Sequence, residues 1–189
     1  TTCHGILAVL DGWVRGDERN RLQFAPSEPL ASATNVEVWM FEPGEIVSDR
    51  EMCDEEQSSL QRGMNFRLPS GRTVILMSRR PNAPYVDRLE DDNRTIIYEG
   101  HDVPRAPGQR DPKLLDQEAR TPTGTLTQNG LFERAARSHR TGGEPERVRV
   151  YEKLRTGIWV YNGTFALTDA WTEPSAGRQV FKFRLEVAL

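Results

Sequence analysis

Cysteine, histidine and lysine are scarce in this sequence, and no long apolar run is present. The 189 residues include 2 Cys, 3 His and 3 Lys. Two cysteines are too few for a disulfide framework or for a zinc site built on cysteine, so we expect two reduced thiols. No apolar segment approaches the length of a membrane span, and no secretory signal is visible. These absences favour a cytoplasmic protein without a membrane partner.

The sequence also lacks the common local signatures of catalysis and cofactor binding. It contains no GxSxG motif, no P-loop and no GxGxxG motif. The histidines, His4, His101 and His139, lie far apart, so no HExxH-type pair of metal ligands is present. We therefore expect no cofactor, no metal site and no catalytic residue.

Charge is abundant and unevenly distributed. Residues 1–60 hold 4 basic and 12 acidic side chains, whereas residues 61–189 hold 21 basic and 16 acidic ones, and 18 of those 21 are Arg. Arginine suits bidentate contacts with phosphates and base edges. Because nucleic-acid affinity depends on local phosphate contacts, the net charge of −3 is compatible with one basic, DNA-binding face.

Strand patterns dominate after residue 72. Apolar or alternating runs predict strands at residues 35–41, 72–78, 94–98, 148–151 and 178–187, and residues 158–168 form either two strands or one strand bent at Asn162-Gly163. Along the last of these strands, Lys182, Arg184 and Glu186 are expected on the polar face. Residues 5–10 fit a first buried strand or helix segment, and residues 14–33 fit a loop.

Two helices have start signals. Ser48, with Glu51 three residues later, predicts a capped helix that runs to Gln61 and stops at Gly63. Thr127 is the expected cap of a second helix over residues 128–138. Together the elements predict an α+β fold, in which a strongly curved, mostly antiparallel sheet or open β-barrel carries flanking helices.

One strand end, Ile96–Asp102 (IIYEGHD), carries residues that suit two kinds of chemistry. Glu99, His101 and Asp102 can form an acid/base or metal cluster of a hydrolytic enzyme. Alternatively, Tyr98 and residues 85–87 (YVD) can line a slot for a planar base, with aromatic stacking and a carboxylate that accepts from cytosine's exocyclic amine. A base enters such a slot only after leaving the duplex stack, at a cost of a few kcal/mol. The local residues leave both interpretations open.

From about residue 44 onward, an ordered series of segments resembles the SRA (YDG) domain. The matching segments are residues 44–46, 48–52, 60–64, 74–78, 85–87, 97–100, 116–117, 126–131, 148–151, 161–163 and 181–185. The variants YEGHD, LTQNG and VYEK…GIW are similar to bacterial SRA-like domains that are fused to HNH nucleases in modification-dependent restriction endonucleases. The resemblance divides the chain into an N-terminal extension of unknown role, residues 1–43, packed on an SRA-like domain, residues 44–189.

The resemblance implies a PUA-like fold that binds double-stranded DNA by flipping 5-methylcytosine or 5-hydroxymethylcytosine into a pocket. The implied pocket residues are Met77, Ser78, Tyr85, Asp87, Tyr98, Glu99 and Gly100. Tyr85 and Tyr98 would sandwich the base, and Asp87 would accept from its N4 amine. The backbone of Met77-Ser78 would meet the O2 edge, and the backbone of Glu99-Gly100 would close the pocket.

Further residues are implied to contact the DNA outside the pocket. They are Gln57, Ser58 and Ser59 as a minor-groove finger, Arg105 and Arg110 in a major-groove loop (residues 101–113), and Arg79 and Arg80 beside the phosphates. A homodimer and an HNH nuclease domain outside this chain are also expected.

Two departures from the family pattern bear on the pocket. Glu99 stands where eukaryotic members have Thr, so two carboxylates are expected to face the pocket and to alter base preference. Asp87 follows its Tyr by two residues instead of three, which leaves its role open. Two other functions also remain: a hydrolytic or metal-dependent enzyme that uses Glu99, His101 and Asp102, and a PUA-type module that binds RNA.

Overall fold

The computed structural model of this chain describes residues 41–81, 83, 85–90, 94–105, 108 and 110–188. The elements predicted within residues 5–40 lie outside the described residues, as does nearly all of the expected N-terminal extension. Phe41, the first described residue, already packs in the core, with its ring centroid 6.4 Å from that of Tyr161. No helix of the described part is long and apolar enough to cross a membrane.

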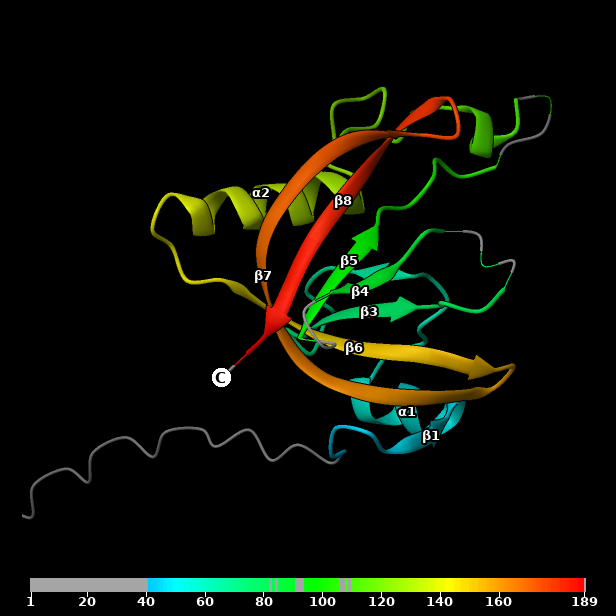
Figure 1. The fold of residues 1–189 in the computed structure, drawn as a ribbon, viewed down its shortest axis with the longest axis vertical. Coiled ribbons are helices and arrows are strands. Elements are labelled where there is room, and N and C mark those ends of the chain that lie inside the picture. The colour runs from blue at the N-terminus through cyan, green and yellow to red at the C-terminus, as the bar shows by residue number, and fades with distance from the viewer. Residues whose placement is uncertain are drawn as a thin grey trace, which may run out of the picture. The chain divides into compact units, whose positions relative to one another are not determined.

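Among the described residues, eight strands form one strongly curved sheet (Figure 1). The strands are β1 (Ile46–Ser48), β2 (Met64–Asn65), β3 (Thr73–Met77), β4 (Arg88–Glu90), β5 (Thr95–Glu99), β6 (Glu146–Arg155), β7 (Ile158–Ser175) and β8 (Arg178–Val187). Their order is β2-β3-β6-β7-β8-β5-β4, and β1 pairs with β7. β3 and β6 run parallel, whereas the other pairs of described strands are antiparallel. The predicted curved, mostly antiparallel sheet is confirmed.

The long strand β7 supplies much of the curvature, as its arc in Figure 1 shows. Its pairing with β6 shifts register between Val150↔Gly163 and Tyr151↔Tyr161, which leaves Asn162 as an extra residue. A second shift, opposite β8, leaves Thr168 extra. Such β-bulges bend a strand and increase its twist. Residues 158–168 therefore belong to one bent strand, and Asn162 is a bulge residue within it.

Both predicted helices are present and begin at their predicted caps. Helix α1 (Asp49–Glu56) starts with a capping box, in which the Ser48 hydroxyl accepts from the Glu51 N–H at 3.2 Å and the Glu51 carboxylate accepts from the Ser48 N–H at 2.8 Å. It ends before the predicted Gln61, because Gln57 takes a left-handed conformation with φ 52°. Helix α2 (Gln128–Arg140) starts after Thr127, and a short 3₁₀ helix, η1 (Pro112–Leu114), precedes it.

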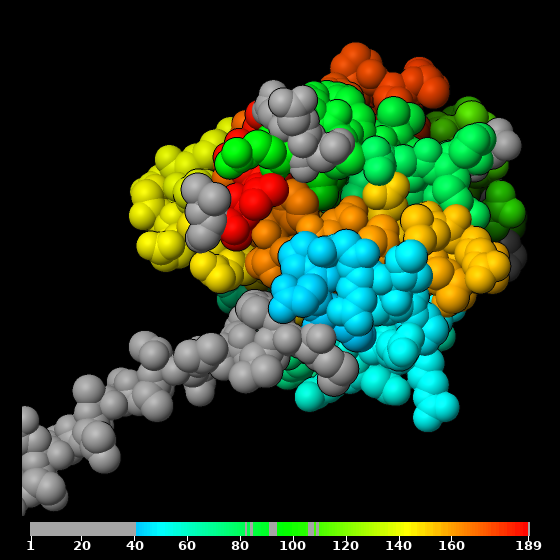
Figure 2. Space-filling view, turned by 60° about the horizontal axis from the view of Figure 1, so that its bottom comes forward, coloured from blue at the N-terminus to red at the C-terminus, as the bar shows by residue number. Residues whose placement is uncertain are grey.

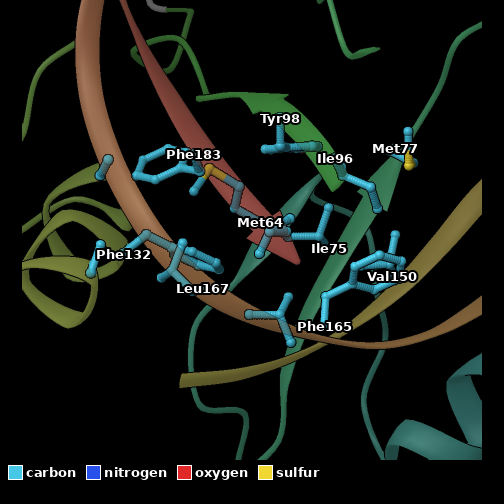
Figure 3. Packing of buried hydrophobic residues seen from close by; sticks show 14 of the residues in the cluster. Met64, Ile75, Met77, Ile96, Tyr98, Phe132, Val150, Phe165, Leu167 and Phe183 are labelled. Carbon is cyan, nitrogen blue, oxygen red and sulfur yellow. The ribbon is translucent and has the colours of Figure 1, made fainter. Parts of the chain in front are cut away.

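The main core lies where α2 packs against the sheet (Figure 3). Phe132 of α2 is fully buried, with ring centroids of Phe66 and Phe183 at 5.4 and 5.6 Å. A second cluster, which includes Met52 of α1 and Tyr151 of β6, lies under α1. The two helices are thus fixed on the sheet by apolar burial, at about 1.5–3 kcal/mol per large side chain.

One prediction about β8 is wrong. Lys182 was expected on the polar face of this strand, but its side chain is only 1% exposed. The reason is a cross-strand partner, because Glu99 of β5 lies directly opposite Lys182 in the register. A buried lysine is tolerated when a carboxylate pairs with it.

Candidate functional site

A pocket of about 440 Å³ lies between Leu76 of β3 and Tyr98 of β5, and its volume is in the range of ligand-binding pockets, roughly 300–1,000 Å³. Five of the residues predicted for base or DNA binding line it: Ser78, Arg80, Tyr85, Asp87 and Tyr98. They come from the end of β3, the segment before β4, and β5. Residues 60–63, which follow α1, form another part of the wall together with Leu76.

Tyr98 belongs to both the pocket and the core. Its side chain is only 3% exposed, and its hydroxyl lies 3.5 Å from the carbonyl oxygen of Leu76. A Cβ added at Gly63 would lie 2.6 Å from that hydroxyl oxygen, so the glycine permits the close approach. Burial raises the pKa of the Tyr98 phenol well above its ordinary value, so the hydroxyl stays protonated. Tyr98 is therefore a fixed, neutral part of the pocket wall.

Tyr85 is half-buried and is held from outside the pocket. The Lys113 ammonium of η1 lies 3.7 Å from the Tyr85 ring centroid, which is a cation–π contact. Lys113 also forms a 2.7 Å ion pair with Asp102, and Asp102 forms a 2.6 Å ion pair with Arg178. Burial, and then the charge of Asp102, raise the pKa of Tyr85. The loop between β5 and η1 thereby helps to orient a ring that lines the pocket.

Asp87 is the carboxylate of the pocket. One oxygen accepts from the Ser78 N–H at 3.2 Å, and the other accepts from the Glu99 N–H at 3.0 Å. Burial raises the pKa of Asp87 to about 6, and the charge of Glu99 adds to this, although the two hydrogen bonds and Lys182 act in the opposite direction. These bonds fix the orientation of the carboxylate, and each oxygen retains acceptor capacity for a ligand.

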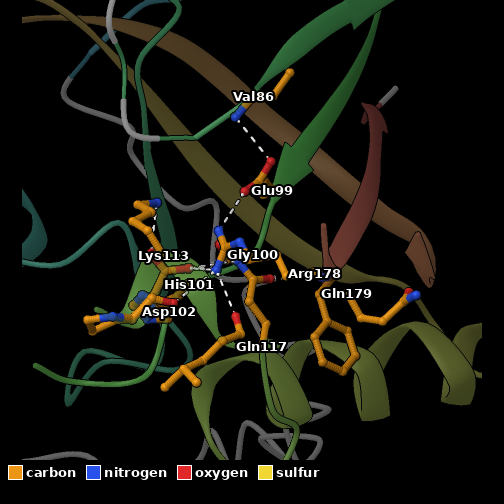
Figure 4. A network of polar contacts seen from close by, with 12 residues as sticks. Val86, Glu99, Gly100, His101, Asp102, Lys113, Gln117, Arg178 and Gln179 are labelled. Carbon is orange, nitrogen blue, oxygen red and sulfur yellow. Dashed lines mark hydrogen bonds and ion pairs between the residues drawn. The ribbon is translucent and has the colours of Figure 1, made fainter. Parts of the chain in front are cut away.

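Glu99 does not line the pocket, although two carboxylates were expected to face it. Successive side chains of a strand point to opposite faces, so Tyr98 and Glu99 cannot both do so. Glu99 instead forms a 2.9 Å ion pair with Lys182. It also lies 3.4 Å from Arg178 and accepts from the Val86 N–H at 3.2 Å (Figure 4). Its acceptor positions are therefore used to hold the segment that carries Tyr85 and Asp87.

Gly100 and Met77 also lie behind the pocket wall. The Gly100 N–H donates to the Phe181 carbonyl at 2.9 Å, and its carbonyl accepts from the Gln117 amide at 2.7 Å. A Cβ at Gly100 would approach the Asn129 side-chain oxygen to 2.6 Å, so close packing requires a glycine there. Met77 is buried in the main core.

The cluster of Glu99, His101 and Asp102 has the form of a structural network. Both carboxylates are neutralised by cations, as Figure 4 shows for Arg178 and Lys113. Burial lowers the pKa of His101. Although burial acts to raise the pKa of Asp102, hydrogen bonds from Lys113 and Arg178 lower it overall. In the described part of the chain, no group of three His, Cys, Asp or Glu side chains is placed to hold a metal ion.

Of the residues predicted to contact DNA outside the base pocket, only Arg80 lines the pocket. Residues 57–59 directly precede the wall segment 60–63, with Gln57 and Ser59 exposed. Arg80 lines the pocket, whereas Arg79 is paired with Glu152 at 2.9 Å. Arg105 and Arg110 are exposed residues of the predicted major-groove loop, and neither lines the pocket.

The far side of the pocket is formed by residues that the sequence did not assign to a site: Asp49, Arg62, Lys153 and Trp159. The Trp159 indole N–H donates to Asp49, and the Lys153 ammonium lies 5.3 Å from the Trp159 ring centroid. The pairing Lys153↔Trp159 belongs to the β6–β7 hairpin. The turn residues Thr156-Gly157 lie between two strand patterns and indicate a hairpin. Such a hairpin would have predicted that Lys153 and Trp159 lie opposite each other.

Comparison with known proteins identifies the fold. No protein-family model and no curated protein matches the sequence. Among solved structures, the SUVH5 SRA domain with fully hydroxymethylated CG DNA is 23% identical, with a TM-score of 0.52 over 77% of this chain and 87% of that chain. The SUVH5 SRA domain with hemi-methylated CG DNA is 22% identical, with a TM-score of 0.53 over 78% of this chain and 88% of that chain.

KRYPTONITE in complex with mCHG DNA and SAH is 17% identical, with a TM-score of 0.52 over 78% of this chain and 32% of that chain. At such low identities, similarity of structure shows a shared fold but does not show which ligand is bound. This chain therefore has the fold of SRA domains, with a curved sheet and two helices among its described residues.

Proposed function

We propose that this domain binds double-stranded DNA and takes a flipped, modified cytosine, 5-methylcytosine or 5-hydroxymethylcytosine, into the pocket between β3 and β5. The observation that carries the proposal is the set of groups in that pocket. A half-buried tyrosine, a buried tyrosine and an oriented carboxylate line one cavity in a fold shared with domains solved on methylated DNA. Such a set suits a flat ring with an exocyclic amine.

In this proposal each pocket residue makes a different contact with the base. The Tyr85 ring offers a stacking face, and Tyr98 forms the opposing, immobile wall. Asp87 accepts a hydrogen bond from the cytosine N4 amine through acceptor capacity that Ser78 and Glu99 leave open. Because the Ser78 N–H already donates to Asp87, the O2 edge of the base must be met by other donors near the end of β3.

Binding of matched duplexes tests the proposal. Fluorescence polarisation at physiological salt should give at least about tenfold tighter binding to a duplex with one central 5-methylcytosine or 5-hydroxymethylcytosine than to the unmodified duplex. Tyr85→Ala and Asp87→Asn should reduce this ratio, because both side chains line the pocket. Trp171→Ala, which alters a partly exposed aromatic outside the pocket, should preserve it.

Equal affinity of the wild-type domain for modified and unmodified duplexes would contradict the proposal. A preference for single-stranded RNA over every duplex would favour the RNA-binding alternative. Thermal unfolding of each variant separates a loss of recognition from a loss of folding. Tyr98→Ala is less informative alone, because Tyr98 is also part of the core.

We also propose that the domain provides specificity for a modification-dependent restriction endonuclease. The similarity of YEGHD, LTQNG and VYEK…GIW to domains fused to HNH nucleases supports this role. This chain alone should then bind modified DNA without cutting it, whereas a parent protein with a nuclease domain should cut modified DNA in the presence of a divalent metal. Cleavage by this chain alone, abolished by Glu99→Gln, would instead support the hydrolytic alternative.

The expected homodimer is a separate proposal, which light scattering of the purified domain tests through its molar mass.

A further inference from the structure

The tip of the β6–β7 hairpin has a local irregularity beside the pocket. Lys153 pairs with Trp159 and Arg155 pairs with Ile158, so Leu154 is an extra residue in β6. A β-bulge of this kind changes the direction of a side chain and is common next to binding sites. The Leu154 side chain is directed toward solvent and is 45% exposed.

The hairpin tip is held firmly by α1. The Asp49 N–H donates to the Gly157 carbonyl at 3.0 Å, and the Asp49 carboxylate accepts from the Trp159 indole. Ser48 also pairs with Ile158 across β1 and β7. These contacts present Leu154 and Arg155 on a rigid support, which lowers the entropic cost of placing them against a partner.

Cationic side chains lie beside the exposed leucine in the chain and in the wall of the pocket. Lys153 and Arg155 are its neighbours in β6, and Arg62 and Arg80 line the pocket together with Lys153. Within the described part of the chain, none of the four forms an ion pair with a carboxylate. Arg79, Arg88 and Arg184, by contrast, all have acidic partners. Unpaired cations beside a pocket suit the phosphates that flank a bound nucleotide.

The hairpin is also continuous with the proposed base-binding pocket. Lys153 and Trp159 line that pocket, and the next two residues extend outward from its edge. In Figure 2 the gold end of β6 lies at the surface between the cyan residues that include α1 and the green residues of the chain's middle. A duplex whose flipped base fills the pocket must therefore pass close to the hairpin tip.

We propose that the β6–β7 hairpin tip, residues 153–156, is a DNA-contacting element, with Leu154 as an apolar wedge and Lys153 and Arg155 as phosphate contacts. This inference rests on the proposed function and adds a contact surface to it. Leu154 inserts beside the base pair that flanks the flipped nucleotide, where apolar wedges stabilise unstacked DNA. The phosphate contacts add affinity that does not depend on the modification.

A comparison of two duplexes tests the wedge. Leu154→Ala should weaken binding to a fully paired duplex with one 5-methylcytosine about tenfold, because the duplex must be opened there. The loss should shrink to less than about threefold when the 5-methylcytosine is mispaired, since a mispaired base costs less to extrude. Val187→Ala is the control, because Val187 is a 40% exposed apolar residue on another strand. It should leave both affinities unchanged.

A salt titration tests the phosphate contacts. Arg155→Ala should weaken binding to modified and unmodified duplexes equally and should reduce the slope of log K against log salt by about 1. Arg147→Ala removes an exposed arginine from the opposite end of the same strand and should leave the slope unchanged. Thermal unfolding midpoints of all variants should stay within about 2 °C of wild type, because the altered side chains are exposed.

The outcomes separate the two proposals. If the wild-type domain discriminates modified DNA but Leu154→Ala and Arg155→Ala bind like wild type, the hairpin proposal alone is overturned. An equal loss for Leu154→Ala on paired and mispaired duplexes would overturn the wedge. If the wild-type domain binds no duplex DNA, both the hairpin and the proposed function fail.

Discussion

At the scale of single residues, the two carboxylates that flank the pocket wall have opposite roles. Asp87 faces the pocket and is held by two backbone N–H groups, whereas Glu99 faces away and is neutralised by Lys182 and Arg178. The alternation of a β-strand decides this, because it turns Glu99 away once Tyr98 faces inward. If the pocket takes a base as proposed, Glu99 therefore acts on that base through the segment that it supports.

The raised pKa of Asp87 gives a prediction about pH. Because burial raises it to about 6, the stability that the neutral carboxyl contributes is fully present below pH 3.8 and is lost as pH rises through about 6. The free domain favours the neutral Asp87 carboxyl, whereas a bound cytosine amine should favour the ionised carboxylate because it donates a hydrogen bond to it. Binding of the modified duplex should therefore weaken as pH falls through 6. Fluorescence polarisation should show about tenfold weaker binding to the modified duplex at pH 5 than at pH 7.

The matched control for this pH effect is Asp87→Asn. The amide cannot ionise, so this variant should bind modified DNA more weakly than wild type at pH 7 and should show no further step near pH 6. The charges of Glu99 and Lys182 also act on Asp87, and neither group is altered in this variant. A pH step of equal size in Asp87→Asn would assign the titration to another group.

At the scale of secondary-structure elements, β5 and β8 are joined by a buried ion pair in register. Glu99 and Lys182 are 3% and 1% exposed, so each needs compensation of its charge, and each supplies it to the other, with Arg178 as a second cation beside Glu99. Removing one partner from a buried pair costs about 3–5 kcal/mol, whereas replacing both with apolar residues of similar size is often neutral. The β5–β8 pair is therefore expected to be strongly coupled.

A double-mutant cycle measures this coupling. Lys182→Met and Glu99→Gln should each lower the free energy of unfolding by about 3 kcal/mol in urea denaturation, and the double variant should lose less than their sum. Arg184→Met, which alters the partly exposed cation two residues further along β8, is the control and should cost less than about 1 kcal/mol. Strict additivity of the two single changes would show that the pair does not act as a unit.

At the scale of the whole molecule, the pocket depends on a sheet that is bent by bulges and supported by α2. Phe132 fixes this helix on the sheet between Phe66 and Phe183. Phe132 shares the main core with Tyr98, but it is not among the residues that line the pocket.

Phe132→Ala should therefore destabilise the domain by about 3–5 kcal/mol through the cavity that it leaves. Below the unfolding transition, the folded fraction should retain the discrimination between modified and unmodified duplexes. Calorimetry measures the loss of stability, and fluorescence polarisation at low temperature measures the ratio of affinities for modified and unmodified duplexes. A loss of discrimination in a fully folded variant would mean that α2 positions the pocket directly.

Much of the local structure was predictable because its causes lie within a few residues. Ser48 with Glu51, and Thr127 before α2, are caps whose partners are three residues away. The alternation in residues 178–187 predicted β8 with its full length. The early end of α1 was missed, because no residue near Gln57 has the Gly or Pro signal that usually marks a helix end.

The sequence by itself indicated both helices with their caps, the strands β3, β5, β6, β7 and β8, and the grouping of Tyr85, Asp87 and Tyr98, which lie close together along the chain. The short strands β1, β2 and β4 were not predicted. Only the tertiary structure decided that Glu99 turns to Lys182, that Gly100 is a packing residue, and that Lys153 and Trp159 complete the pocket. The physical reason is the range of the interactions. Caps and periodicity act between near neighbours, whereas cross-strand pairs join residues more than 80 positions apart, as Glu99 and Lys182 do.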